Sequence, residues 1–346
     1  MNERRFDIDW LRVIAIGLLL IYHVAIAFQP WGVMIGFPTN KESWTALWAP
    51  MSMLNIWRIP LLFFVSGMGV YFALQRRNWK ELITERAMRI LVPFIFGVFV
   101  IVPIHVLIWR YYYNMALVYS PDPGHLWFLR NIFVYVLVLS PLFFYLKHNE
   151  GGKVVLWTRK VFSHPLGLLL VIGCFTLEAM ILKPNPYELY AMTWHGWALG
   201  LLAFLFGFCF VLSGEGFLKM IVKGRWAFVA IAVVLFIARI TYFHLKVPYV
   251  LLVTESDCWI FSLLAFGYKY LNHGGKALSY LSKAAYPVYI LHMIFLYLGG
   301  LWLFPLDIPV SLKFVALLVI TGAGCFLTFE FVIRRLKWIG LLFGVK

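Results

Sequence analysis

The feature that most constrains this chain is a succession of ten long apolar runs, separated by charged or Pro/Gly-rich breaks. Each run contains 19 to 27 residues, and about 20 apolar residues are enough for a helix to cross a bilayer. Of the 346 residues, 63% are hydrophobic and only 13% are charged, which excludes an ordinary soluble domain. We therefore predict an all-α, polytopic integral membrane protein. The predicted transmembrane helices cover residues 10–30, 48–74, 90–109, 127–146, 164–182, 190–213, 226–245, 248–268, 280–304 and 309–333.

Basic residues are distributed unevenly over the predicted loops. With the N-terminus inside, the cytoplasmic segments hold 21 Lys and Arg residues, Lys346 among them, and the outer segments hold five. This bias predicts that both termini are cytoplasmic. In a membrane protein the net charge of +15 reports orientation, so we expect no nucleic-acid partner. We expect one transmembrane domain over residues 1–346, with no appended soluble domain, no cleaved signal peptide and no internal repeat.

The four cysteines lie far apart in apolar runs and lack the spacing of metal ligands. We therefore expect no disulfide, no metal site and no permanently bound cofactor.

The first predicted helix carries the most informative polar residues. Asp9 and Arg12 are three residues apart on one face, and His23 follows eleven residues after Arg12, which is roughly 16 Å along a helix. Eleven residues is close to three turns, so Arg12 and His23 share a face. This pattern indicates a polar path through the bilayer. The alternative is that Asp9 and Arg12 pair at the membrane surface and His23 is a hydrogen-bonded packing residue.

The second predicted helix has the features of a cavity wall. Pro60 removes a backbone donor, and Ser66 and Gly67 allow another backbone to come close. Arg58 requires an anion, and the candidates are Glu178, Glu255 and Asp257. Because Glu255 and Asp257 are two residues apart, we expect them to point in different directions from their helix.

Arg86 and Arg89 lie one helical turn apart at a predicted cytoplasmic membrane edge. They could clamp a phosphate, or they could serve only as positive-inside anchors. At the opposite side, His125 and Trp127 precede the fourth predicted helix, where an aromatic interfacial belt is the alternative. Tyr289 and His292 share a face of a later helix, where core packing is the alternative.

The residues identified above resemble the membrane-bound acyltransferase family 3, and within it the branch of glucan-biosynthesis succinyltransferases. Six motifs occur in the family's order, and the resemblance covers nearly the whole chain. The matching residues are Arg12 and His23, Phe63, Phe64, Ser66 and Gly67, Arg86 and Arg89, the His-Leu-Trp-Phe-Leu segment 125–129, the Thr-Glu-Ser triplet 254–256, and Tyr289 with His292.

The resemblance implies that an acyl group passes from cytoplasmic acyl-CoA, a donor substrate, to a hydroxyl of an extracytoplasmic glycan or glycolipid. We expect His23 to act as general base or to accept the acyl group itself, and both routes stay open. The other residues expected in catalysis are Asp9, Arg12, Glu255 and His292, with Arg86 and Arg89 on the CoA phosphates. Substrate-binding candidates are Arg58, Ser66, His125, Trp127 and Tyr289.

The expected location is a bacterial inner membrane, where membrane lipid surrounds the chain. Acetyl and succinyl donors both stay open, as does a homodimer. A transporter or flippase of an anionic or glycan-lipid substrate is the alternative function, since it explains ten helices equally well. A non-catalytic scaffold would leave the intramembrane His, Asp and Glu residues without a purpose.

Overall fold

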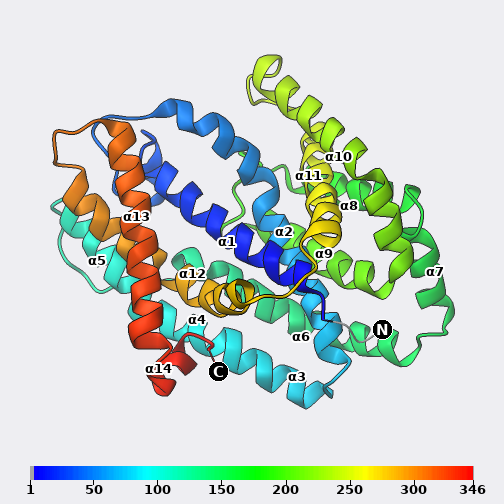
Figure 1. Cartoon of the computed structure of the whole chain (residues 1–346). Coiled ribbons are helices and arrows are strands. Elements are labelled where there is room, and N and C mark those ends of the chain that lie inside the picture. The colour runs from blue at the N-terminus through cyan, green and yellow to red at the C-terminus, as the bar shows by residue number, and fades with distance from the viewer. Residues whose placement is uncertain (1–3, 346) are drawn as a thin grey trace. The chain divides into compact units, whose positions relative to one another are not determined.

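The computed structural model describes residues 4–345, so Lys346, counted above among the cytoplasmic residues, lies outside the described part. Within that part the chain is all helical, and nine helices are long and apolar enough to cross a membrane. A tenth span results if the bent pair α7 and α8 counts as one. The prediction of an all-helical, multi-pass membrane protein is therefore confirmed. Figure 1 shows the helices coloured from blue to red in chain order.

As far as the structure describes it, the first half of the chain contains seven α-helices, five 3₁₀ or π-helical turns and the first four predicted spans. The α-helices are α1 (Phe6–Ile26), α2 (Trp48–Leu74), α3 (Trp79–Arg86), α4 (Val92–Phe96), α5 (Val102–Tyr112), α6 (Trp127–His148) and α7 (Lys153–Phe162). Short 3₁₀ turns lie at η1 (Gly32–Ile35), η2 (Thr45–Leu47) and η5 (Gly124–Leu126), and π-helical turns at η3 (Ala87–Leu91) and η4 (Gly97–Ile101).

The second half contains α8 (Leu166–Leu182), α9 (Trp194–Leu212), α10 (Glu215–Thr241), α11 (Tyr249–Tyr270), α12 (Lys276–Leu303), α13 (Val310–Thr328), η6 (Phe329–Ile333) and α14 (Lys337–Leu342). Two predicted starts were wrong. The third span begins at Trp79 instead of residue 90, and the seventh begins at Glu215 instead of residue 226. Both errors have one cause. A helix can extend beyond its apolar residues into polar ones as long as its backbone N–H and C=O groups are hydrogen-bonded, and hydropathy does not detect that extension.

A capping box explains where the third span begins. The backbone N–H of Glu81 donates to Asn78 Oδ1 at 3.0 Å, and the backbone N–H of Asn78 donates to Glu81 Oε2 at 3.0 Å. These reciprocal bonds satisfy two of the open donors at a helix start. The π-helical turns η3 and η4 are followed directly by segments with Pro93 and Pro103 in their first turn. Each proline lacks a backbone donor, so a widened turn before it keeps the helix continuous through Tyr112.

The chain divides into two compact units. Unit 1 contains the described residues up to Ala15, together with Asn55–Thr84 and Asn131–Leu278. Unit 2 contains Ile16–Leu54, Glu85–Arg130 and the described residues from Ser279 onward.

In unit 1, α2 and α9 approach each other through glycine. A Cβ on Gly67 would lie 1.9 Å from the carbonyl oxygen of Phe204, and a Cβ on Gly207 would lie 2.1 Å from that of Phe64. Any larger residue would push the two backbones apart. The predicted close approach at Ser66 and Gly67 is therefore confirmed, and small residues serve this purpose in membrane helices generally.

Candidate active site

The most compact group of titratable side chains lies in unit 2 and includes two of the predicted residues. His23 on α1 and His292 on α12 place Nδ1 and Nε2 2.7 Å apart, with ring centroids separated by 5.0 Å and nearly parallel rings. His292 is fully buried, and His23 is partly buried. Residues 269 positions apart in sequence are thus in direct hydrogen-bond contact.

The partners of His292 determine where the protons lie. Its Nδ1 is 2.6 Å from the carbonyl oxygen of Tyr289, and because a carbonyl can only accept, this nitrogen carries a proton. In neutral His292 the other nitrogen, Nε2, is then an acceptor. The proton between the two rings must therefore belong to His23 Nδ1, so Nε2 of a neutral His23 is unprotonated. The contacts of one helix thus fix the tautomer of a residue on another.

His125 and Tyr289, which we expected to bind substrate, lie next to this pair. His125, in η5, donates from Nε2 to the carbonyl oxygen of Ile290 at 3.1 Å, and the Tyr289 hydroxyl donates to the carbonyl oxygen of His125. The His125 and His292 rings are 5.1 Å apart. The shared face of Tyr289 and His292 is also confirmed, with their rings 6.0 Å apart. Trp127 is buried at the first position of α6.

His105 on α5 completes the group, and sequence reasoning missed it. Its ring centroid lies 5.3 Å from that of His125, and its side chain is buried. Because His105 falls inside a predicted span, the rule that intramembrane ionisable residues are functional by default should have identified it. We call His23, His292, His125 and His105 the histidine cluster. Among residues 4–345, no three His, Cys, Asp or Glu side chains are arranged to hold a metal ion.

Arg86 and Arg89 also lie in unit 2, at the junction of α3 and η3. Both point toward Glu85, with Arg89 Nη1 2.9 Å and Arg86 Nε 3.6 Å from its carboxylate oxygens. The Arg89 side chain is 51% exposed, so much of its guanidinium is open to a further anion. Both arginines thus contact the same carboxylate, that of Glu85, and whether they hold a phosphate or only anchor the chain stays a prediction.

Asp9 and Arg12 belong to unit 1, at the start of α1. Arg12 Nη1 lies 3.1 Å from Asp9 Oδ1, the pairing that the alternative interpretation expected, and Arg4 Nη2 lies 2.9 Å from Asp9 Oδ2. A Cβ on Gly69 of α2 would lie 3.7 Å from the guanidinium of Arg12. The Arg12 side chain therefore extends over a glycine that leaves room for it.

The remaining predicted residues in unit 1 have structural partners. Arg239 on α10 donates from Nε and Nη2 to the two carboxylate oxygens of Glu255 on α11, at 2.7 and 2.9 Å, with both side chains buried. Figure 1 shows α10 and α11 running side by side. The role expected for Glu255 toward His23 stays a prediction, and no sequence pattern had indicated Arg239 as its partner. The Ser66 hydroxyl donates to the carbonyl oxygen of Leu62 at 2.7 Å, and Arg58 is buried on α2.

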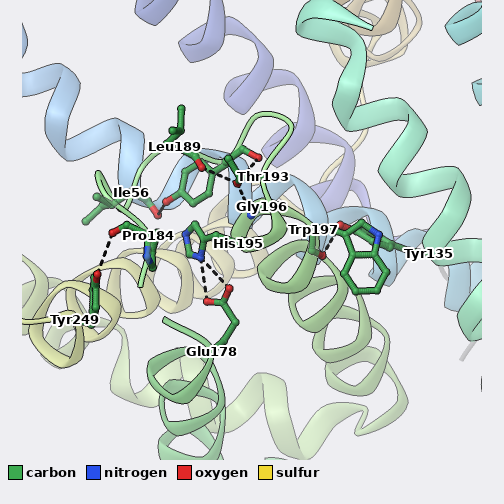
Figure 2. A network of polar contacts seen from close by, with 11 residues as sticks. Ile56, Tyr135, Glu178, Pro184, Leu189, Thr193, His195, Gly196, Trp197 and Tyr249 are labelled. Atoms are coloured by element: carbon green, nitrogen blue, oxygen red, sulfur yellow. Dashed lines mark hydrogen bonds and ion pairs between the residues drawn. The ribbon is translucent and has the colours of Figure 1, made fainter. Parts of the chain in front are cut away.

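A second buried pair in unit 1 involves His195, another residue that sequence reasoning missed. Its Nδ1 lies 2.8 and 3.1 Å from the two oxygens of Glu178, and Figure 2 shows the two side chains facing each other. The pair joins α8 to the start of α9, which accounts for Glu178 without Arg58. Burial, then the charges of Asp257 and Glu178, raise the pKa of Tyr187 well above its ordinary value, so this neighbouring phenol stays neutral. The carboxylates of Glu255 and Asp257 thus face different residues, as predicted.

Comparison with known proteins identifies the family. A family model described as an acyltransferase domain, that of acyltransferase family 3, matches residues 5–330, a range that includes every predicted site residue. No curated protein and no solved structure matches the chain. The match covers nearly the whole chain and both units. The chain is therefore an acyltransferase, a multi-pass membrane protein that belongs to acyltransferase family 3.

Proposed function

We propose that the protein is an O-acyltransferase of a bacterial inner membrane, with both termini in the cytoplasm. It moves an acetyl or succinyl group from cytoplasmic acyl-CoA to a hydroxyl of an extracytoplasmic glycan or glycolipid. Membership of the family favours this reaction over the transporter or flippase considered from the sequence. The single observation that carries the proposal is the hydrogen-bond chain from Tyr289 through His292 to His23.

These hydrogen bonds place the proton of His23 on Nδ1, so we assign the role of general base to its Nε2 atom. As the hydroxyl oxygen attacks the thioester carbonyl, Nε2 accepts its proton, and the C–S bond breaks when the tetrahedral intermediate collapses. The imidazolium then gives that proton to the departing thiolate, which leaves as CoA thiol, so atoms and charge balance. His292 stabilises the positive charge on His23 because its Nε2 accepts from Nδ1. The same unprotonated Nε2 could instead attack the thioester and carry the acyl group itself, so the acyl-enzyme route stays open beside direct transfer.

Arg86 and Arg89 are proposed to hold the CoA phosphates. Arg89 bonds Glu85, yet its side chain stays 51% exposed, so its guanidinium is accessible to an anion. Arg89 and His105 lie on one continuous helical run, Trp79–Tyr112, separated by 16 residues and therefore roughly 24 Å along its axis. The long, thin pantetheine arm of CoA suits this separation, because its phosphates can stay at one membrane edge while the thioester enters the bilayer.

The acceptor is proposed to approach the histidine cluster from the outer side, near His125 and Trp127. A neutral hydroxyl is a suitable acceptor for the histidine cluster, because it has one proton to lose and Nε2 of His23 can accept it. Asp9 and Arg12 are proposed to fix the cytoplasmic end of α1, which carries His23. Arg58 and Ser66 are retained as candidates for the acceptor in unit 1.

The experiment is a thiol-release assay on the purified, full-length protein. Acetyl-CoA or succinyl-CoA is supplied with and without a linear glucan oligosaccharide, and free CoA thiol and acylated glycan are measured together. We expect both products in equal amounts, and only when donor and glycan are present. Donor consumption without ester formation, or no consumption with any hydroxyl acceptor, would contradict the proposal.

A further inference from the structure

Two aromatic side chains close the histidine cluster into a ring of contacts. Beyond His105, the next centroid is that of Tyr297 on α12, at 5.2 Å, and Tyr297 lies 5.8 Å from Phe37. Phe37 returns to His23 at 5.6 Å, edge to face. Four imidazoles and two apolar rings thus form one closed circuit, and all six belong to unit 2.

The loop that carries Phe37 is held in place by several hydrogen bonds. Gly36 has a φ of +83°, which favours glycine, and its carbonyl oxygen accepts from the Tyr297 hydroxyl at 2.6 Å. The Phe37 backbone donates to the carbonyl oxygen of Gly32 at 3.0 Å and accepts from the Tyr113 hydroxyl at 3.1 Å. Phe37 is only 6% exposed. Its ring is therefore a prebuilt wall beside His23.

The position of Phe37 limits what can surround the reacting carbon. If Nε2 of His23 accepts the proton of the attacking hydroxyl, the thioester carbonyl lies within reach of the same imidazole. The acyl chain beyond that carbonyl must then share space with the nearest neighbours of His23. Phe37, on the loop after α1, is an apolar neighbour of His23, and Tyr297 packs against Phe37. An acyl chain that extends in this direction meets Phe37, on a hydrogen-bonded loop, and behind it Tyr297 on α12.

We propose that Phe37 and Tyr297 determine acyl specificity, restricting the donor to short, uncharged acyl groups of about the size of acetyl. This inference rests on the function proposed above and chooses between its two donors. Phe37 offers no hydrogen bond, and the Tyr297 hydroxyl already donates to Gly36. The terminal carboxylate of a succinyl group would therefore lose its hydration on this side without a partner. A butyryl group would meet the wall by its length alone.

The test compares acyl donors in the full-length protein with a linear glucan oligosaccharide as acceptor. Acetyl-, butyryl- and succinyl-CoA are assayed with the wild type and with Phe37→Leu and Phe37→Ala. We expect the wild type to prefer acetyl over butyryl by about tenfold or more, because one methylene in an apolar site changes specificity by about 10- to 200-fold. The ratio of kcat/KM for acetyl-CoA to kcat/KM for butyryl-CoA should fall from the wild type to Phe37→Leu and fall again in Phe37→Ala. Both donors are assayed with the same preparation, so a lower fraction of folded protein reduces both values equally and leaves their ratio unchanged.

Phe28→Ala is the matched control. Phe28 is a fully buried aromatic of the same unit that packs against Phe304 and Phe314, outside the ring of contacts. This variant should lose stability and keep the wild-type ratio. A wild type that uses butyryl- or succinyl-CoA as well as acetyl-CoA would overturn the specificity inference alone, as would a Phe37→Ala ratio equal to that of Phe28→Ala. A wild type that consumes no acyl-CoA would overturn the proposed function together with it.

Discussion

Replacing His292 tests the tautomer argument without touching the proposed base. In His292→Leu, the Nδ1 proton of His23 loses an acceptor that lies 2.7 Å away in a buried position. An unsatisfied buried donor costs about 1 to 3 kcal/mol, and His23 can avoid that cost by moving its proton to Nε2. The base would then be protonated at the atom that must accept. If the full cost appears in the transition state, kcat falls by about 5- to 150-fold.

His292→Gln separates positioning from packing. The Gln Oε1 atom can reach the place of the lost Nε2 and accept from His23, so we expect activity between those of the wild type and His292→Leu. The assay is kcat and KM for acetyl-CoA at saturating glucan, with thermal unfolding measured on the same samples. We expect KM for the donor to stay constant, because the donor phosphates are proposed to bind at Arg86 and Arg89. Wild-type kcat in folded His292→Leu would refute the tautomer argument.

Three further predictions concern the rest of the molecule. Arg86→Ala with Arg89→Ala should weaken acyl-CoA binding, because each guanidinium–phosphate bond contributes about 1.5 to 3 kcal/mol, and Arg86→Lys should not restore it fully; unchanged affinity by calorimetry would leave the pair as a membrane anchor. Arg239→Ala should destabilise by about 3 to 5 kcal/mol by leaving Glu255 buried and unpaired, and Arg239→Met with Glu255→Leu should recover much of the loss in thermal unfolding. A reporter inserted at Lys153 should be cytoplasmic, and an external signal would reverse the predicted orientation.

The sequence predicted the spans well where apolar length alone decides them. The second predicted helix, 48–74, coincides with α2, because its ends are set by a turn and by charged residues. The starts at Trp79 and Glu215 could not be obtained from hydropathy, because helix ends outside the apolar region depend on capping and on good helix formers. The 96° bend between α7 and α8 lies at Pro165, which a reading of apolar runs does not resolve into two helices.

For the site, sequence separation was the limit. Arg12 with Asp9 and His292 with Tyr289 were predictable because helical periodicity relates residues three apart. The contact between His23 and His292 joins α1 to α12, and no periodicity relates helices so far apart in the chain. Arg239 and Glu255 are only 16 residues apart, but they lie on two different helices, α10 and α11, and periodicity within one helix does not relate them. His105 was within reach of the sequence, since an intramembrane histidine is itself a signal, whereas the role of Phe37 depends on a loop conformation.

The most direct test of the central claim is the rate of acyl transfer by folded His23→Ala, measured per folded molecule with acetyl-CoA binding determined on the same sample. The account predicts that donor binding is retained and that transfer falls by about a hundred- to ten-thousand-fold, the usual loss when a general base is removed. Transfer at the wild-type rate would contradict the assignment of His23 as the base and would move that role to another member of the histidine cluster.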